Sequence, residues 1–279
     1  MRPAHPVAAG ASRLGPPIDA RPLFGAELAA LLDTLRGLRP ADWRAPAVPG
    51  WTVRDLAVHL LGAYQGRLGA HQRVRRPGER LEAFIHRTNQ EWVDRHADEP
   101  PARLPDALER AGGRLVARFA SADLAAPALG VSWAGVDPAP AWLDIAREYT
   151  EYWTHRQQIR HAVGQPTDPE PRALATVLDT FLRALPHTLR HTAAPAGSRV
   201  AVVVEGQVGG RWTATATADG WSLSEPPGGA PTASVVLDPE TAWRLCTRGI
   251  DPGTAVGRAR PRGDRRLAEA ACRIVSIVH

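Results

Sequence analysis

The sequence predicts an α+β protein in two parts, a helical N-terminal part and a smaller C-terminal part that contains an antiparallel sheet. Apolar residues recur at helical spacing through the first 165 residues. A proline-rich break, GQPTDPEPR, follows at 164–172, and the composition then changes to β-branched and alternating segments. We therefore expect a helical domain over residues 20–165 and a small α+β domain over residues 166–279.

The residues before the first helix form a separate segment. Residues 1–19 are rich in proline, glycine and alanine, and they lack the continuous apolar core of a secretory signal peptide. Chain ends of this composition are poorly ordered unless something holds them. We therefore expect residues 1–19 to be a disordered tail outside both domains.

The helical domain is expected to contain helices and no strands. From Phe24 to Leu38 the apolar residues share one face, and proline-containing sequence then ends the helix. Thr52 begins the second helix, because Asp55 three residues later completes the pattern of a capping box. His59 lies on the apolar face of this helix. Further helices are expected over about residues 79–97, 103–121 and 139–163.

The C-terminal domain begins with a helix expected over about residues 172–191. The segments SRVAVVVEG, RWTATATADGWSLSE and TASVVLD then have the β-branched content or strict alternation of strands, and Asp219-Gly220 is a hairpin signal. Helical patterns return at about residues 239–248 and 264–278. The pattern is typical of a small antiparallel sheet with helices beside it.

Composition narrows the classes of function. All 34 basic residues are arginine, which excludes a Schiff-base lysine and a P-loop lysine. The net charge of +5 is dispersed among acidic residues, and no apolar run approaches the ~20 residues that cross a bilayer. With only Cys246 and Cys272, a reducing cytoplasm fits and a disulfide framework does not. We therefore expect neither nucleic acid nor a membrane as a partner, and composition leaves a monomer and a homodimer both open.

The long helix carries a pair of potential metal ligands. Glu151 and His155 are four residues apart and therefore lie one above the other on the helix. With His59 they would supply two imidazoles and one carboxylate to the interior of a helical bundle, which is a half-open site for a divalent ion. Spacing alone leaves the alternative open that these are a surface ion pair and ordinary core histidines.

Two longer motifs point to a known family. PAVPGWTVRDLAVHLLG at 46–62 and EYWTHRQQIRHAVGQP at 151–166 resemble the paired signatures of the mycothiol-dependent maleylpyruvate isomerases, within the DinB-like four-helix superfamily. The resemblance implies a four-helix bundle followed by a sterol-carrier-like C-terminal domain. It also implies that His59, Glu151 and His155 bind zinc or a similar divalent ion, and that mycothiol is the thiol cofactor.

The implied chemistry is thiol addition to a small electrophilic substrate. A divalent ion with an open position stabilises a thiolate, which is a strong nucleophile. Both cysteines look structural, so the thiol should come from the cofactor. The outcome would be either cis–trans isomerisation or S-transfer.

Arginine is the residue type that the resemblance assigns to substrate carboxylates. Arg244 and Arg248, expected on one helix of the C-terminal domain, are the candidates, and a solvated helix face is an equally good interpretation of them. We expect the substrate to lie between the two domains, where pockets are common.

Two other classes of function remain open. One is a non-catalytic protein that holds an apolar ligand in the sterol-carrier-like domain, with a structural metal or none. The other is a regulatory or resistance protein that keeps the bundle but has lost turnover. Metal content, and the response of a bound metal to thiols, discriminate the enzyme from the ligand-binding protein.

Overall fold

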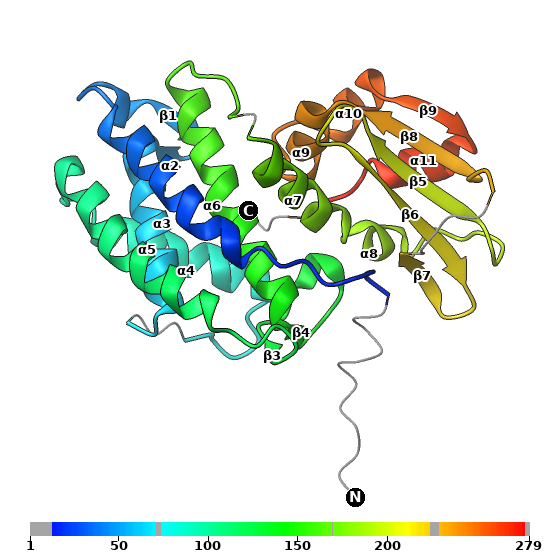
Figure 1. The fold of residues 1–279 in the computed structure, drawn as a ribbon, viewed down its shortest axis with the longest axis horizontal. Helices are drawn as coiled ribbons and strands as arrows, with labels where there is room; N and C mark the ends of the chain where they lie inside the picture. Colours follow the sequence, from blue (N-terminus) through cyan, green and yellow to red (C-terminus); the bar gives the residue numbers. More distant parts are fainter. Residues whose placement is uncertain (1–12, 71–73, 169, 224–228, 277–279) are drawn as a thin grey trace, which may run out of the picture. The chain divides into compact units, whose positions relative to one another are not determined.

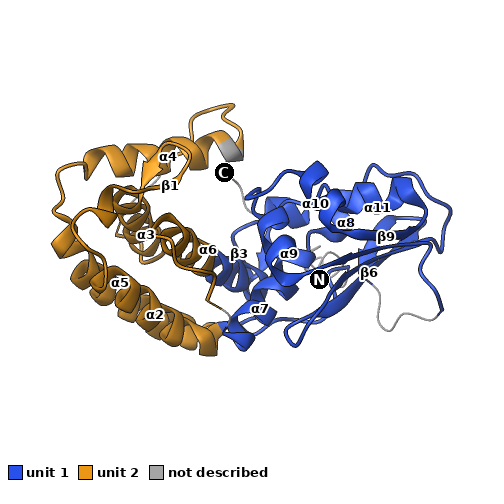
Figure 2. Cartoon of the chain, turned by 90° about the horizontal axis from the view of Figure 1, so that it is seen from above, with its two compact units in different colours: residues 1–20, 123–150, 169–278 blue, residues 21–122, 151–168, 279 orange. Residues whose placement is uncertain are grey.

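The structure is a computed structural model that describes residues 13–70, 74–168, 170–223 and 229–276 (Figure 1). The chain forms two compact units (Figure 2). The first, here called the helical unit, contains residues 21–122 and 151–168. The second, here called the mixed unit, takes in the described residues among 1–20, 123–150 and 169–278.

The helical unit contains the helices expected in the first part of the sequence. Its core includes a cluster of aromatic rings, in which the Phe24 and Phe119 centroids are 4.9 Å apart and those of Tyr64 and Tyr152 are 4.6 Å apart. Neighbouring rings meet at steep angles, an arrangement that favours aromatic contacts. The helices are α2 (Phe24–Arg36), α3 (Val53–Arg67), α4 (Leu81–Arg95), α5 (Leu104–Ala120) and the C-terminal part of α6 (Ala141–Ala162).

The expectation that the first 165 residues contain no strands was wrong. Strands β1 (Pro46–Val48) and β2 (Trp51–Thr52) pair in a short antiparallel ladder around Gly50, whose φ of 83° requires a left-handed turn. Strands β3 (Pro127–Ala128) and β4 (Ala139–Pro140) form a second ladder. Both ladders lie in proline-rich connections, where strand segments of two or three residues carry no readable alternation.

Residues 123–150 cluster with the mixed unit, although they lie before the expected boundary near residue 165. Contacts within the mixed unit account for this grouping. The Arg183 guanidinium lies over the Trp142 ring at 5.9 Å. The 3₁₀ turn Ser132–Ala134 contacts helix α8 (Leu185–Leu189). Helix α6 therefore begins in the mixed unit and continues into the helical unit.

The mixed unit contains a five-stranded sheet of order β7-β6-β5-β8-β9. Most neighbours are antiparallel, as predicted, but β5 and β8 run parallel, with Val200 opposite Ala233. The sheet is therefore mixed, because the chain leaves β5 through the β6–β7 hairpin and returns beside β5 in the same direction. The strands are β5 (Arg199–Val204), β6 (Gly210–Thr217), β7 (Gly220–Leu223), β8 (Ala233–Leu237) and β9 (Arg260–Gly263).

Several boundaries in the mixed unit differ from the prediction. The helix expected over 172–191 is divided into α7 (Pro171–Leu182) and α8, and Pro186 lies at the start of α8, the position that tolerates proline. Strand β9 was missed because RPRG is exposed and has no apolar alternation. The remaining helices are α9 (Pro239–Cys246), α10 (Pro252–Arg258) and α11 (Arg265–Ala271).

Part of the expected disordered tail is ordered. Leu14 and Ile18 are buried, and the Arg13 carbonyl accepts a hydrogen bond of 2.8 Å from the Leu223 amide. The Arg183 guanidinium donates to the Leu14 carbonyl. The prediction was therefore wrong for residues 13–19, because these apolar side chains and backbone groups have partners in the mixed unit. Residues 1–12, and residues 277–278 of the last predicted helix, lie outside the described residues.

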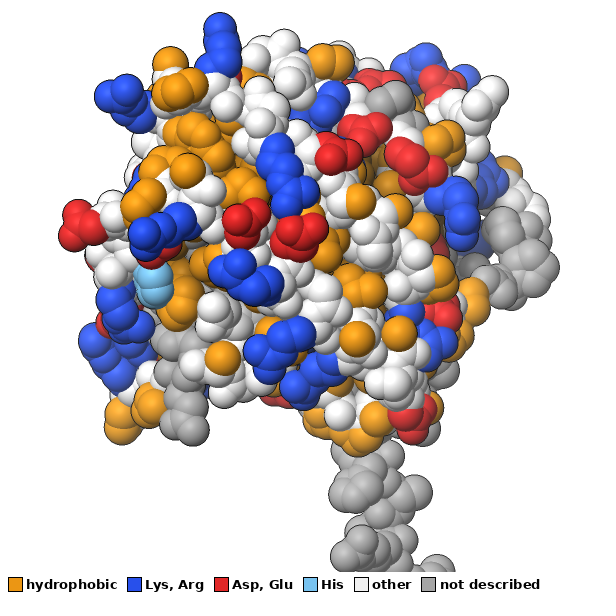
Figure 3. All heavy atoms as spheres, turned by 60° about the vertical axis from the view of Figure 1, so that its left-hand side comes forward, with side chains coloured by type: hydrophobic (Ala, Val, Ile, Leu, Met, Phe, Trp, Pro, Cys, Tyr) orange, Lys and Arg blue, Asp and Glu red, His pale blue; other side chains and the backbone are white. Residues whose placement is uncertain are grey.

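The surface carries dispersed charge. On the face drawn in Figure 3, basic and acidic side chains are interspersed with apolar ones. Among the described residues, every helix is too short or too polar to cross a membrane.

Candidate metal centre

His59 reaches the interior of the helical unit from α3. The capping box predicted for this helix is confirmed: the Thr52 side chain accepts from the Asp55 amide, and the Asp55 carboxylate accepts from the Thr52 amide. Six residues after Val53, on the face turned to the core, His59 is 4% exposed. The start of the helix is therefore fixed by local sequence, and this start determines which face His59 occupies.

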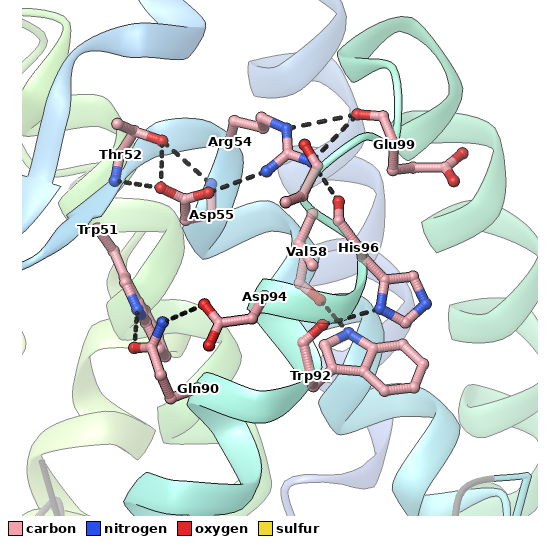
Figure 4. Close-up of polar contacts among 11 residues, drawn as sticks. Trp51, Thr52, Arg54, Asp55, Val58, Gln90, Trp92, Asp94, His96 and Glu99 are labelled. Atoms are coloured by element: carbon pink, nitrogen blue, oxygen red, sulfur yellow. Dashed lines mark hydrogen bonds and ion pairs between the residues drawn. The ribbon is translucent and has the colours of Figure 1, made fainter.

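Helix α4 packs closely against α3 at the residues next to His59. The Trp92 indole donates a 2.9 Å hydrogen bond to the Val58 carbonyl, as Figure 4 shows. Gly62 permits this approach, because a Cβ at that position would lie 2.6 Å from atoms of the Trp92 ring. The Arg54 guanidinium, in the same view, donates to the Glu99 and His96 carbonyls that follow α4.

Glu151 and His155 come from α6, one helical turn apart. Glu151 Oε1 lies 3.1 Å from His155 Nε2 and 3.2 Å from His59 Nε2. One potential ligand atom from each of the three residues lies within 4.8 Å of the other two. The structure therefore brings together the three metal ligands predicted from the sequence, although His59 and Glu151 are 92 positions apart.

The electrostatics of the cluster favour its charged forms. Burial alone would disfavour charge on both Glu151 and His155, but their mutual attraction and hydrogen bonding outweigh it. The pKa of the Glu151 carboxyl therefore lies well below its ordinary value, and the pKa of His155 is raised. Glu151 is thus a carboxylate at neutral pH, the form that binds metal.

Each histidine has a further neighbour outside the cluster. Gln158 Oε1 lies 2.7 Å from His155 Nδ1. The Trp51 ring lies against His59 with centroids 5.0 Å apart, and its indole N–H donates 2.9 Å to Gln90 Oε1 on α4 (Figure 4). Gln90 in turn donates 2.7 Å to Asp94. The histidine rings are held from outside the cluster as well as within it.

The next residue on α6 anchors the helix. Arg156, 2% exposed, makes a bidentate pair with the buried Glu27 of α2, with nitrogen–oxygen distances of 2.6 and 2.9 Å. It also donates 2.7 Å to Asp168. The sequence analysis did not predict this network. Its one indication in the sequence is the acidic residue Glu27 on the apolar face of the first helix.

Chemically, the three donors fit a divalent ion. Zinc bonds of about 2.0–2.2 Å in a tetrahedral site place ligand atoms about 3.4 Å apart. The two separations from Glu151 Oε1, 3.1 and 3.2 Å, are close to this spacing, and all three ligand atoms lie within 4.8 Å of one another. Two imidazoles and a carboxylate leave a fourth position for water, thiol or substrate, as in catalytic zinc sites.

The predicted substrate arginines lie in the mixed unit. Arg244, on α9, pairs with Glu240 one turn earlier at 2.7 Å, and its guanidinium lies over the Trp243 ring. Arg248 is exposed and follows the end of α9 with φ 57°, so the prediction that both arginines lie on one helix was wrong. Arg248 lies outside the helix because its own backbone adopts the left-handed conformation that commonly ends a helix.

Comparison with known proteins gives a family match over the first part of the chain. Residues 24–160 match the family model of the mycothiol maleylpyruvate isomerase N-terminal domain. Through these residues the chain belongs to that family. The match includes α2 to α6 and therefore all three residues of the cluster, and it ends before the C-terminal sheet.

Solved structures of a mycothiol-dependent maleylpyruvate isomerase are also similar to the chain. One is 14% identical with a TM-score of 0.45, over 81% of this chain and 86% of that chain. A histidine-to-alanine variant of that enzyme matches with the same identity and coverage and a TM-score of 0.42. A search of curated proteins gives no match.

Proposed function

We propose that this isomerase-family chain is a metal- and thiol-dependent enzyme that acts on a small electrophilic substrate. The observation that carries the proposal is the convergence of His59, Glu151 and His155 within 4.8 Å. The family match over residues 24–160 supports mycothiol as the thiol. Isomerisation of a cis double bond is the favoured reaction, and S-transfer is the related alternative.

The three side chains would hold a divalent ion, with zinc the first candidate from the donor set. An ion bound there supplies positive charge that stabilises a thiolate at neutral pH. Glu151 contributes the negative charge of the ligand set, and the two imidazoles contribute neutral donors. The Trp51 ring lies against His59, and the Glu151 side chain keeps 22% exposure.

The protein's own thiols are poor candidates for the nucleophile. Cys246 and Cys272 are both buried in the mixed unit. Burial raises the pKa of Cys246 to about 12 and that of Cys272 to about 11, so both are protonated at neutral pH. A thiol that is both buried and protonated does not attack a substrate, which supports a cofactor thiol.

A carrier of an apolar ligand would need a larger cavity than the one described in the core of the mixed unit. This cavity, lined by Leu182, Val202, Cys246 and Cys272 among others, has a volume of about 10 Å³. That is room for about one water molecule. A sterol-sized ligand would require the core to open.

The metal assignment is tested by elemental analysis of the full chain after reconstitution with zinc. We expect one ion per chain in the wild type and a large loss in His155→Ala. Gln165→Ala, an exposed position on the segment after α6, is the matched control and should keep its metal. A wild type without metal, or His155→Ala with full metal content, would refute the assignment.

Turnover is tested with maleylpyruvate and mycothiol on the zinc-loaded protein. We expect consumption of the substrate that requires both the metal and the thiol, and an isomer as product. A stable thioether product would move the assignment to S-transfer. Metal binding without any reaction would favour a protein that has kept the bundle and lost turnover.

A further inference from the structure

Gln158 is the residue that contacts His155 from the side away from Glu151. It lies three residues after His155 on α6, and its Oε1 is 2.7 Å from His155 Nδ1. That distance is short for a hydrogen bond between neutral groups. Gln158 is partly exposed, whereas His155 is 5% exposed. The contact therefore fixes the outer edge of a buried ring.

The identity of the contacting atom determines the protonation of the ring. A carbonyl oxygen only accepts, so His155 Nδ1 must donate to Gln158 Oε1. Nε2 also faces an acceptor, Glu151 Oε1 at 3.1 Å, so it donates there in the metal-free cluster, and its proton is the one that a bound ion would replace. The side chain of Gln158 thus holds the proton on Nδ1, so that Nε2 is the nitrogen that binds an ion.

The amide also leaves the charge of the site unchanged. Of the three ligands, only Glu151 brings a negative charge, so a divalent ion among them leaves one net positive charge. A carboxylate in place of Gln158 would orient the ring equally well but would cancel that charge. A neutral acceptor therefore combines orientation with attraction for one anionic ligand.

We propose that Gln158 is a positioning residue that holds His155 with Nε2 toward the ion and keeps the loaded site positive for a thiolate. This inference rests on the proposed function, because it takes the cluster to be a metal site. It predicts opposite effects for two substitutions. Gln158→Leu removes the acceptor, and Gln158→Glu keeps the acceptor and adds negative charge.

The first experiment measures zinc affinity of the full chain by competition with a chelator. Gln158→Leu should bind zinc about 10–100-fold more weakly, the usual effect of losing an outer hydrogen bond to a ligand. Gln158→Glu should bind at least as tightly as wild type. Gln157→Leu is the matched control, because Gln157 is buried on the same helix and accepts from the Asp168 amide, away from the ligands.

The second experiment titrates the cobalt-loaded proteins with 2-mercaptoethanol and follows cobalt absorption. Gln158→Glu should bind this thiol about tenfold or more weakly than wild type, because of the added charge a few ångströms away. Histidine-ring ¹⁵N spectra of the zinc-loaded wild type should show a protonated Nδ1 on His155. A ring bound to zinc through Nδ1 overturns the proposal whatever the variants do.

The outcomes separate this inference from the proposed function. A wild type that binds no zinc refutes the metal site itself. If the wild type binds zinc and Gln158→Leu binds equally well, Gln158 has no positioning role. Equal losses in Gln157→Leu and Gln158→Leu would assign the effect to the helix. Unchanged thiol binding in Gln158→Glu would refute the charge argument.

Discussion

Arg156→Met should destabilise the helical unit strongly, because it leaves Glu27 without its partner. Arg156 and Glu27 are 2% and 4% exposed and are joined by two hydrogen bonds of 2.6 and 2.9 Å. Removing one partner of such a buried pair costs about 3–5 kcal/mol, since the remaining charge stays desolvated. Asp168 adds little to this cost, because its side chain is 29% exposed and regains water.

The double variant Glu27→Leu, Arg156→Met separates charge burial from packing. Replacing a whole buried ion pair by apolar side chains is often close to neutral. We therefore expect the double variant to recover most of the stability that Arg156→Met loses. Simple loss of side-chain volume would instead make the double variant the less stable of the two.

The assay must report on the unit that contains the pair. A chain with two compact units need not unfold in a single transition, so the total unfolding signal is a poor measure. Native-state hydrogen exchange of amides in α2 and in residues 151–162 of α6 gives the local free energy of opening. A loss below about 1 kcal/mol in Arg156→Met, or no recovery in the double variant, would refute the reasoning.

Two further predictions concern the mixed unit. The native protein should react slowly with iodoacetamide at pH 8, because burial raises the pKa of Cys246 to about 12 and that of Cys272 to about 11. The double variant Cys246→Ser, Cys272→Ser should keep its turnover. Rapid alkylation, or a folded double variant without activity, would place the nucleophile on the protein. Arg244→Ala or Arg248→Ala should raise KM for an acidic substrate about tenfold or more while zinc content stays unchanged. Unaltered kinetics in both variants would leave these arginines as surface residues.

The sequence predicted those parts of the site that depend on local rules. The four-residue spacing of Glu151 and His155 fixes their common face in any helix. The capping box at Thr52 and Asp55 fixes where α3 begins, and so fixes the inward direction of His59. Each of these inferences needs only the geometry of one helix, whereas the expectation that His59 joins Glu151 and His155 came from the family resemblance.

What the sequence could not supply are the contacts between elements. The Arg156–Glu27 pair joins positions 129 apart, and nothing in either helix pattern selects one acid among 29 as the partner. The same holds for Trp51 and Gln90, which meet only because β2 and α4 lie together. Likewise, β8 has the apolar, β-branched content of an ordinary strand, and its parallel pairing with β5 depends on the direction in which the chain returns to the sheet.

The contact between Gln158 and His155 is only partly predictable from the sequence. A residue three positions after a histidine on a helix lies beside it, so the contact with His155 is available from spacing. The direction of the imidazole ring depends also on what its other nitrogen, Nε2, faces. That nitrogen faces Glu151, whose position is set together with His59 on another helix. The orientation of the His155 ring is therefore set by Gln158 and Glu151 on α6, and Glu151 is in turn held by His59 on α3.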